Sequence, residues 1–141
     1  MMMQLFVGGT ASLVNFAIHA LWTVFLDHAV RRYWLRGTNP RLLRHRILLM
    51  MGTAAILMTA HVAEVLVWAT TYVAVGSTPA GAGNVYFAFV NYTTLGYGDI
   101  VPVTEWQLLG PMTAMNGILL FGWSTATIFE VLRASLRGVK H

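Results

Sequence analysis

The chain has 141 residues, of which 57% are hydrophobic and only 10% are charged, and its mean hydropathy is +0.63. Charged residues make up about a quarter of an average soluble domain, so this composition leaves too little polar surface for a water-soluble globule. The absence of cysteine excludes disulfides, zinc–thiolate sites, haem attachment and thiol catalysis. The formal net charge of +4 does not indicate a nucleic-acid partner, because the basic residues cluster beside apolar stretches, as they do at membrane boundaries. These properties predict an all-α membrane protein.

The first apolar stretch runs from Met3 to about Leu26 and contains His19 as its only ionisable side chain. A membrane-crossing helix needs about 20 apolar residues, so this stretch is long enough. A signal peptide is the alternative, but Met-Met-Met-Gln supplies no positively charged start and no clear small-residue cleavage site follows. We therefore expect residues 1–30 to form an accessory transmembrane helix.

A basic segment follows, with six of the nine Lys and Arg residues lying between Arg31 and Arg46. Lys and Arg are enriched on the cytoplasmic side of membrane proteins, so residues 31–46 are predicted to form a cytoplasmic loop. The arginines surround Gly37 and Pro40 instead of recurring at every third position of a membrane helix, which argues against a voltage sensor. The partners expected at this loop are membrane lipids, with anionic headgroups bound by the Arg31–Arg46 cluster.

Two more apolar stretches, Ile47 to about Val75 and about Trp106 to Leu132, are also long enough to cross a bilayer. The second of them ends at another basic cluster, Arg133 to Lys140, which predicts a cytoplasmic C-terminus. Three spans then place the N-terminus outside. We expect a multi-pass protein of the cell membrane, and its compactness suggests a bacterial inner membrane.

The region between these two stretches is neither a full span nor an ordinary loop. Ser77 to Gly83 is a turn of small residues, and Asn84 to Thr94 is apolar and aromatic but too short to cross. A short apolar segment of this kind is typical of a re-entrant helix or a buried element. The segment Thr94-Leu95-Gly96-Tyr97-Gly98-Asp99 comes directly after it.

That segment is suited to holding a dehydrated cation. A bare ion in hydrocarbon is very costly, and a ring of backbone carbonyls is one substitute for its hydration shell. Gly96 and Gly98 sit at alternate positions and accept positive φ without steric penalty, which turns successive carbonyls to one side. The Thr94 hydroxyl offers a further oxygen. The alternative interpretation is an extracellular Gly-Asp turn.

The stretch from Tyr86 to Pro102, which ends in Thr-Leu-Gly-Tyr-Gly-Asp-Ile-Val-Pro, resembles the pore loop of the potassium-channel family, and its match with the flanking helices covers about Ile47 to Leu136. The resemblance implies a homotetramer of subunits with three transmembrane helices, a re-entrant pore helix and a selectivity-filter loop. It implies an outer pore helix (47–76), a turret, pore helix and filter (77–103), an inner pore-lining helix (104–136) and a short cytoplasmic tail (137–141). The implied filter residues are Thr94, Leu95, Gly96, Tyr97 and Gly98, with K⁺ held at the first four as the permeant ion and no cofactor.

The residues around the filter depart from the family pattern. Leu95 replaces the usual valine, and Tyr86 and Phe87 replace a frequent pair of tryptophans. Val90 occupies the position where some bacterial members carry a glutamate that braces the filter aspartate. The alignment therefore predicts that the Tyr86 hydroxyl braces Asp99. A second polar partner behind the filter is Asn91.

The third span carries the residues expected to control the inner pore. The resemblance makes Gly117, and secondly Gly122, a gating hinge, while the alternative is that these small residues let membrane helices pack closely. Ser124, Thr125 and Thr127 either line the cavity or bond back to their own helix, and the second is the more common arrangement. Glu130 is expected to pair with Arg133, or else to form an acidic ring at the inner mouth.

Four polar residues in the first two spans predict a buried cluster. An ionisable side chain within a span needs a partner, and Glu64 has His61 three residues earlier on the same helical face. Asn15 and His19 share a face of the first span and would lie at matching depths if the two helices pack antiparallel. The predicted cluster is a hydrogen-bond network that sets helix register or, alternatively, a pH sensor. A metal site is least favoured, because there are few ligands.

These patterns predict a potassium-selective channel subunit that conducts passively. The alternatives are a weakly selective cation channel and a cation-binding membrane subunit that acts as a sensor or assembly partner without conducting. An enzyme is not expected, because the sequence contains no catalytic triad, carboxylate pair or phosphate-binding loop.

Overall fold

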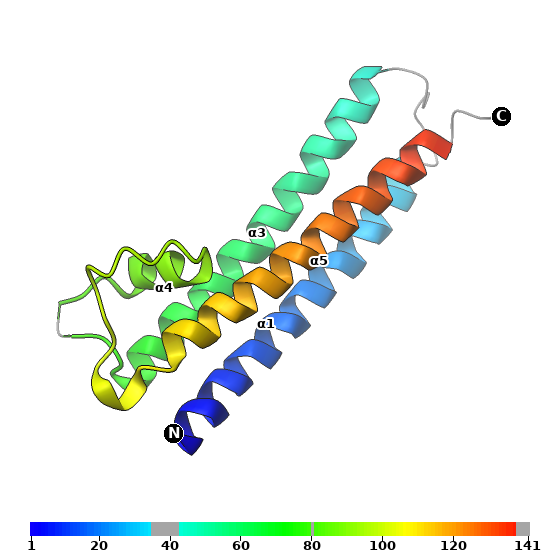
Figure 1. Ribbon diagram of the computed structural model, residues 1–141. Helices are drawn as coiled ribbons and strands as arrows, with labels where there is room; N and C mark the ends of the chain where they lie inside the picture. The colour runs from blue at the N-terminus through cyan, green and yellow to red at the C-terminus, as the bar shows by residue number, and fades with distance from the viewer. Residues whose placement is uncertain (35–42, 80, 138–141) are drawn as a thin grey trace.

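The computed structural model describes residues 1–34, 43–79 and 81–137, and these residues form helices and no strands (Figure 1). The long helices are α1 (Met2–Ala29), α3 (Leu43–Val75) and α5 (Leu109–Arg137), and α4 (Asn84–Tyr92) is short. A π-helical turn, Val30–Trp34, continues α1, and a 3₁₀ turn, Thr104–Trp106, precedes α5.

Three helical segments, Met2–Arg32, Leu43–Val75 and Thr104–Leu136, are long and apolar enough to cross a membrane. Large apolar side chains are exposed along all three, which is expected where lipid takes the place of water. Examples are Phe6, Leu13, Leu21, Phe25, Leu48, Met51, Met58, Ile118 and Phe129.

The predicted basic loop is shorter than residues 31–46 because its ends are helical. Arg31 and Arg32 belong to the π-helical turn, while Arg44 and Arg46 lie in the first turn of α3. The Arg31 Nε donates to both carboxylate oxygens of Asp27, four residues earlier, at 2.8 and 2.9 Å, and this pair supports the extra turn. The Gly37 and Pro40 break and the tail from residue 138 onward lie outside the described residues.

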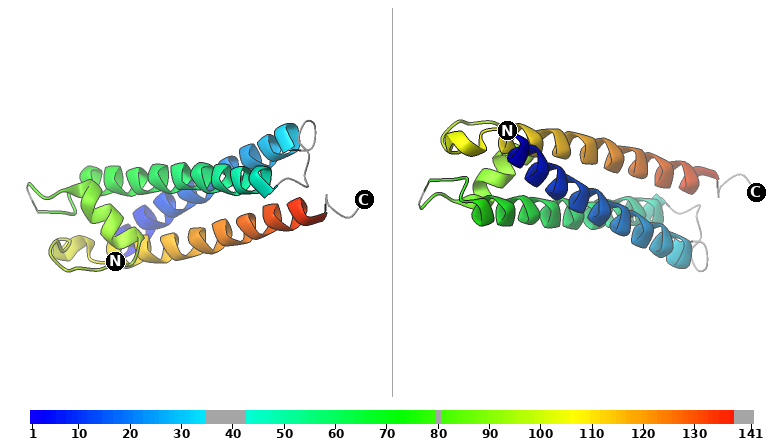
Figure 2. Two further views of the ribbon diagram at one scale, coloured as in Figure 1. Left: turned by 90° about the horizontal axis from the view of Figure 1, so that it is seen from above. Right: turned by 90° about the horizontal axis from the view of Figure 1, so that it is seen from below.

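The short helix α4 and the first helix α1 lie on opposite sides of the α3–α5 pair, as the two views in Figure 2 show. Helix α1 runs obliquely, with its N-terminal end beside the start of α5. There the Leu108 backbone N–H donates to the Gln4 side-chain oxygen at 2.9 Å. Because α1 contacts both α3 and α5, it is an integral part of the bundle.

Helix α3 ends in a Schellman motif that turns the chain toward α4. Gly76 has a φ of 61°, its N–H bonds to the Val73 carbonyl, and the Ser77 N–H bonds to the Tyr72 carbonyl. The far end of this loop is held next to the end of α3, because the Val103 N–H donates to the Ser77 carbonyl at 2.8 Å. Residues 77–103 therefore form a loop whose two ends meet.

Aromatic side chains fill the space between α4 and the long helices. Trp68, Tyr72, Phe87 and Tyr92 are at most 3% exposed, and the Tyr72 and Phe87 ring centroids lie 4.9 Å apart. The Tyr72 hydroxyl is satisfied by the Thr113 hydroxyl at 2.5 Å. This packing holds α4 rigidly against α3 and α5 and fixes where its C-terminal end lies.

Candidate functional site

The chain leaves α4 through a left-handed residue. The Leu95 N–H bonds to the Val90 carbonyl and the Thr94 N–H to the Asn91 carbonyl, both at 2.9 Å, which is a Schellman pattern. Glycine is usual at the left-handed position, but here it is Thr94, with a φ of 61°. A β-branched residue in this region costs about 1–3 kcal/mol and persists only where its surroundings impose it.

The left-handed conformation recurs at every second residue after Thr94. Gly96 has a φ of 59° and Gly98 a φ of 76°, as the alternate spacing of the glycines predicted. This alternation turns successive carbonyls toward one side, unlike the alternating carbonyls of an ordinary strand. Residues 93–99 are all exposed in the single chain. The segment therefore has a conformation suited to coordinating an ion and is not covered by its own subunit.

The predicted support residues divide into a buried and an exposed group. Phe87 and Val90 are buried, and Phe87 packs on Tyr72. The Asn91 side chain donates to the Phe87 carbonyl of its own helix at 3.0 Å and faces Gly110 of α5. Phe87 and Val90 thus support the loop through packing, while Asn91 contacts helix backbone.

Tyr86 and Asp99 belong to the exposed group and are neighbours. Asp99 raises the pKa of the Tyr86 hydroxyl, first through hydrogen-bond attraction and further through its charge. The geometry places the two groups together, and the brace stays a prediction.

Gly117 lies where the C-terminal end of α4 meets α5. A Cβ added at this glycine would be 2.0 Å from the Tyr92 carbonyl oxygen, a backbone atom with little freedom to move. Gly122, by contrast, has no heavy atom within 4 Å of the added Cβ. The structure therefore gives Gly117 a close-packing role, and the hinge at either glycine stays a prediction.

The hydroxyls that follow on α5 have different partners. Thr125 and Thr127 bond back to the carbonyls of Phe121 and Trp123, at 2.8 and 3.0 Å. Ser124 was expected to line the cavity or to bond back to its own helix. Its hydroxyl instead hydrogen-bonds to the His61 ring at 2.9 Å. Glu130 and Arg133 are both exposed and lie 4.0 Å apart, which is the expected i, i+3 pair.

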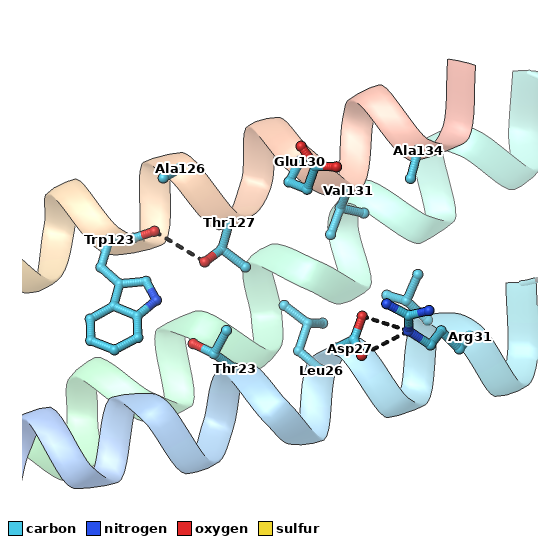
Figure 3. A pocket seen from close by; sticks show the side chains of 11 residues that line it. Thr23, Leu26, Asp27, Arg31, Trp123, Ala126, Thr127, Glu130, Val131 and Ala134 are labelled. Atoms are coloured by element: carbon cyan, nitrogen blue, oxygen red, sulfur yellow. Dashed lines mark hydrogen bonds and ion pairs between the residues drawn. The ribbon is translucent and has the colours of Figure 1, made fainter. Parts of the chain in front are cut away.

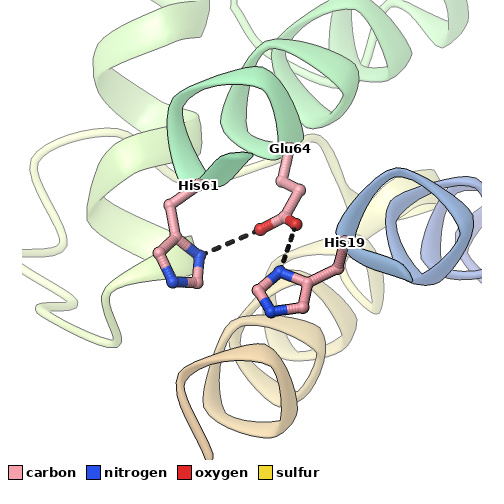
Figure 4. A group of neighbouring side chains, drawn as sticks. All are labelled: His19, His61 and Glu64. Atoms are coloured by element: carbon pink, nitrogen blue, oxygen red, sulfur yellow. Dashed lines mark hydrogen bonds and ion pairs between the residues drawn. The ribbon is translucent and has the colours of Figure 1, made fainter. Parts of the chain in front are cut away.

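Three of the four polar residues predicted to cluster, His19, His61 and Glu64, are brought together between α1 and α3 (Figure 4), and Asn15 joins them from α1. The fully buried Glu64 accepts from His19 Nδ1 at 2.8 Å and from His61 Nδ1 at 3.0 Å. The Asn15 side-chain amide donates to the Glu64 carbonyl at 3.2 Å. The cluster therefore joins α1 to α3 at the depth expected from antiparallel packing.

Helices α4 and α5 complete this cluster. The Tyr92 hydroxyl donates to the Glu64 carboxylate, and the Ser124 hydroxyl lies 2.9 Å from His61 Nε2 and 3.4 Å from His19 Nε2. One layer further along, Asn116 Oδ1 accepts from Asn15 at 2.9 Å and from the Trp68 indole at 3.0 Å. A single polar network thus touches all four helices.

His19, His61 and Glu64 are residue types that bind metals, and their nearest ligand atoms lie within 4.8 Å of one another. Each histidine nitrogen, however, is at hydrogen-bond distance from a different carboxylate oxygen. A zinc ion would need bonds of about 2.0–2.2 Å to nitrogen and oxygen ligands at once. The present arrangement of these three side chains is that of a hydrogen-bond network, while in the next layer Asn15 Oδ1 and Asn116 Nδ2 have no partner among the described residues.

The sequence did not indicate that Tyr92, Asn116 and Ser124 join this network. Tyr92 belongs to the short aromatic segment before the filter, and its contact with Glu64 depends on where α4 ends. The available signal was on α5, where Thr113, Asn116 and Ser124 recur at helical spacing and form a buried polar stripe.

A crevice of about 530 Å³ lies between α1 and α5, away from the α4 end of the bundle (Figure 3). The Asp27–Arg31 ion pair lies on its α1 side, and Glu130 lies on its α5 side. Its wall is otherwise mostly apolar and is completed by Thr23, Leu26, Val30, Trp123, Ala126, Thr127, Val131 and Ala134.

Comparison with known families decides the class of the protein. A family model described as an ion channel matches residues 60–134, just over half of the chain. The chain belongs to the pore-loop family of ion channels. The resemblance to potassium-type channels found in the sequence is thereby confirmed at the level of the family, which is a family of channels and not of enzymes.

The matched region of this ion channel runs from the middle of α3 to near the end of α5. It includes α4, the left-handed segment and most of the polar cluster, while α1 with Asn15 and His19 lies outside it. No curated protein and no solved structure matches the chain. The accessory helix is therefore understood from its contacts alone.

Proposed function

We propose that the protein is a potassium-selective channel subunit and that four copies surround one pore. The observation that carries the proposal is the alternating left-handed backbone at Thr94, Gly96 and Gly98. Carbonyls turned to one side form a ring only when several copies of the segment meet at an axis. K⁺ would then bind between the carbonyls of Thr94, Leu95, Gly96 and Tyr97, with the Thr94 hydroxyl adding oxygen ligands.

The exposure of this segment supports assembly into a homotetramer. Leu95 is 53% exposed and Tyr97 66% exposed in the single chain. Non-helical backbone at membrane depth is tolerated only where protein surrounds it or where it lines a water-filled cavity. Neighbouring copies would supply this cover, with α4 as the re-entrant pore helix of each copy and its C-terminal dipole end favouring a cation.

The distribution of charge supports one orientation in the membrane. Arg31, Arg32, Arg44 and Arg46 lie at the same end of the bundle as Arg133, and α4 lies at the other end (Figure 1). A cytoplasmic C-terminus and an external N-terminus follow from the positive-inside rule. The proposed location is the cell membrane, and the compactness of the chain suggests a bacterial inner membrane. The arginine-rich end would contact anionic lipid headgroups.

The proposal is tested by potassium flux into liposomes that contain the purified protein, with Gly98→Ala as the test variant. Gly98 has a φ of 76°, so alanine there disfavours the left-handed backbone, and potassium flux should fall at least tenfold. Gly81→Ala is the matched control, because Gly81 has a φ of 81° and nothing within 4 Å of the added Cβ, but lies outside the filter. The control should conduct like the original protein.

The same liposomes separate the two rival functions. A reversal potential in mixed potassium and sodium that follows the potassium gradient supports selectivity, whereas one between the two gradients shows a weakly selective pore. No flux from folded, tetrameric protein would instead favour a cation-binding subunit that does not conduct.

A further inference from the structure

The buried network around Glu64 has a hydrogen-bond pattern that fixes its number of protons. Helix α1 contributes His19, α3 contributes His61 and Glu64, and α4 contributes Tyr92. At the two imidazole rings, helix α5 contributes the uncharged Ser124 hydroxyl. The rings of Trp123 and Phe121 cover the two imidazoles, at centroid distances of 5.3 and 4.8 Å.

The contacts on the carboxylate side set the tautomers of both histidines. A carboxylate only accepts hydrogen bonds, and the Tyr92 hydroxyl, which lies 2.9 Å from His61 Nδ1, gives its single hydrogen to Glu64. The Nδ1 atoms that approach Glu64 at 2.8 and 3.0 Å therefore each carry a hydrogen. In a neutral imidazole the other nitrogen then has a lone pair and no hydrogen. Two neutral histidines would therefore both present acceptors to Ser124.

Ser124 cannot satisfy two acceptors. Its oxygen lies 2.9 Å from His61 Nε2 and 3.4 Å from His19 Nε2, but a hydroxyl has a single hydrogen to donate. All contacts are made only if one Nε2 receives the Ser124 hydrogen while the other carries a hydrogen of its own and donates to the same oxygen. The pattern thus requires one proton more than a carboxylate and two neutral imidazoles provide.

We propose that Glu64, His19 and His61 form a binding site for one exchangeable proton, which the two histidines share through the Ser124 hydroxyl. The same number of protons results if the extra proton lies on the Glu64 carboxyl group and one imidazole adopts its other tautomer. The proton is therefore shared by Glu64, His19 and His61 and is not assigned to one of them. The bound form has zero net charge. Loss of the proton leaves a net negative charge among the membrane helices, and gain of a second leaves a positive one.

The site is placed to influence the filter, an extension that rests on the proposed function. Tyr92 is the last residue of α4, its hydroxyl donates to Glu64, and its carbonyl is packed against Gly117. Thr94, where the left-handed segment begins, follows two residues later. A change of charge at Glu64 therefore acts on the residue that holds the start of the filter in place.

The proton count is measured directly by NMR of the intact protein in lipid bilayers, with ¹⁵N-labelled histidine and ¹³C-labelled glutamate. Ring-nitrogen and carboxyl shifts report which atoms carry hydrogen. Within one pH interval, we expect the ring nitrogens of His19 and His61 and the Glu64 carboxyl group to carry three protons in total. At the lower and upper ends of that interval, we expect the NMR signals of His19 and His61 to change together. His28, which is exposed and lies outside the network, serves as the internal reference for the histidine signals.

Ser124→Ala removes the shared hydroxyl and should make the His19 and His61 signals titrate separately, whereas Ser124→Thr keeps a hydroxyl and should restore their common transition. Ser135→Ala is the matched control, because Ser135 is also buried on α5 but bonds only to the Leu132 carbonyl. The shared site would be overturned if His19, His61 and Glu64 together carried two protons at every pH at which the protein is folded. It would also be overturned if the His19 and His61 signals of the original protein titrated separately.

The extension to the filter is tested by potassium flux measured against pH. We expect the flux profile of Ser124→Ala to be shifted relative to the original protein, and that of Ser135→Ala to be unchanged. Identical profiles would overturn the link to the filter. Because NMR counts protons without any flux, a protein that does not conduct but still shows three protons would refute the proposed function and leave the proton site standing.

Discussion

Among the described glycines, Gly117 lies closest to backbone of another helix, the C-terminal end of α4. The Tyr92 carbonyl would lie 2.0 Å from a Cβ at this position, far inside contact distance. Relief would require α4 or α5 to move, and α4 is held by buried Phe87 and Tyr92. The glycine is therefore needed for the packing that positions the left-handed segment, whatever part it plays in gating.

Gly117→Ala should destabilise the protein by about 1–3 kcal/mol, the usual cost of forcing extra volume into a packed interior. Thermal unfolding in detergent micelles measures the change. Gly122→Ala adds the same methyl group to the same helix where no atom lies within 4 Å, so it should leave the unfolding temperature unchanged. Equal stability of the two variants would contradict the packing role.

Local spacing was enough to predict part of the polar cluster but not all of it. His61 and Glu64 are three residues apart and Asn15 and His19 four apart, so each pair could be placed on one helical face from the sequence. Tyr92 and Ser124 are 28 and 60 residues from Glu64 along the chain (92 − 64 and 124 − 64). Their contacts depend on how α4 and α5 pack, which no local pattern encodes.

At the scale of elements, apolar length predicted the three long helices and the short α4, because a span must be apolar over about 20 residues. The helix ends were less predictable. Asp27 and Arg31 extend the first helix, and α3 begins at Leu43, before the apolar stretch. The strained end of α4 at Thr94 was not foreseen, since threonine is not a residue expected at positive φ.

Helix α1 is fixed to the rest of the bundle by few polar contacts, and Asn15 makes two of them. Its amide donates to Asn116 at 2.9 Å and to the Glu64 carbonyl at 3.2 Å. Within membranes apolar surface drives helix association only weakly, so such hydrogen bonds and close packing decide how helices pair. Asn15 is therefore a main determinant of where α1 docks.

Asn15→Leu should loosen α1, because it removes both donated bonds, each worth about 0.5–1.5 kcal/mol, and leaves their acceptors buried. Hydrogen–deuterium exchange in nanodiscs should show faster exchange of α1 amides than in the original protein. Ser12→Ala lies on the same helix and loses only a bond to the Gly8 carbonyl, so it should exchange at the original rate. Unchanged exchange in Asn15→Leu would show that packing alone holds α1.

At the scale of the whole molecule, a single chain leaves the proposed filter uncovered. The left-handed segment from Thr94 to Gly98 is exposed beside apolar side chains such as Tyr97, which is 66% exposed. Non-helical backbone within a membrane is stable only where protein covers it or where it lines a water-filled cavity, and in the proposed assembly other copies supply that cover. Cyclic assembly of identical chains satisfies this requirement, because each copy covers the same surface of the next.

The assembly should contain four copies of the 15.6 kDa chain and should be more stable in potassium than in sodium. An ion that binds only the folded assembly stabilises it by mass action, by about 2.7 kcal/mol at a hundred times its dissociation constant. Light scattering of the detergent-solubilised protein measures the number of copies, and thermal dissociation in KCl and NaCl of equal ionic strength measures the ion effect. Gly98→Ala, which disturbs the proposed filter, should remove the difference between the two salts, while Gly81→Ala should retain it. A dimer, or equal dissociation temperatures in both salts for the original protein, would refute a potassium site shared by four subunits.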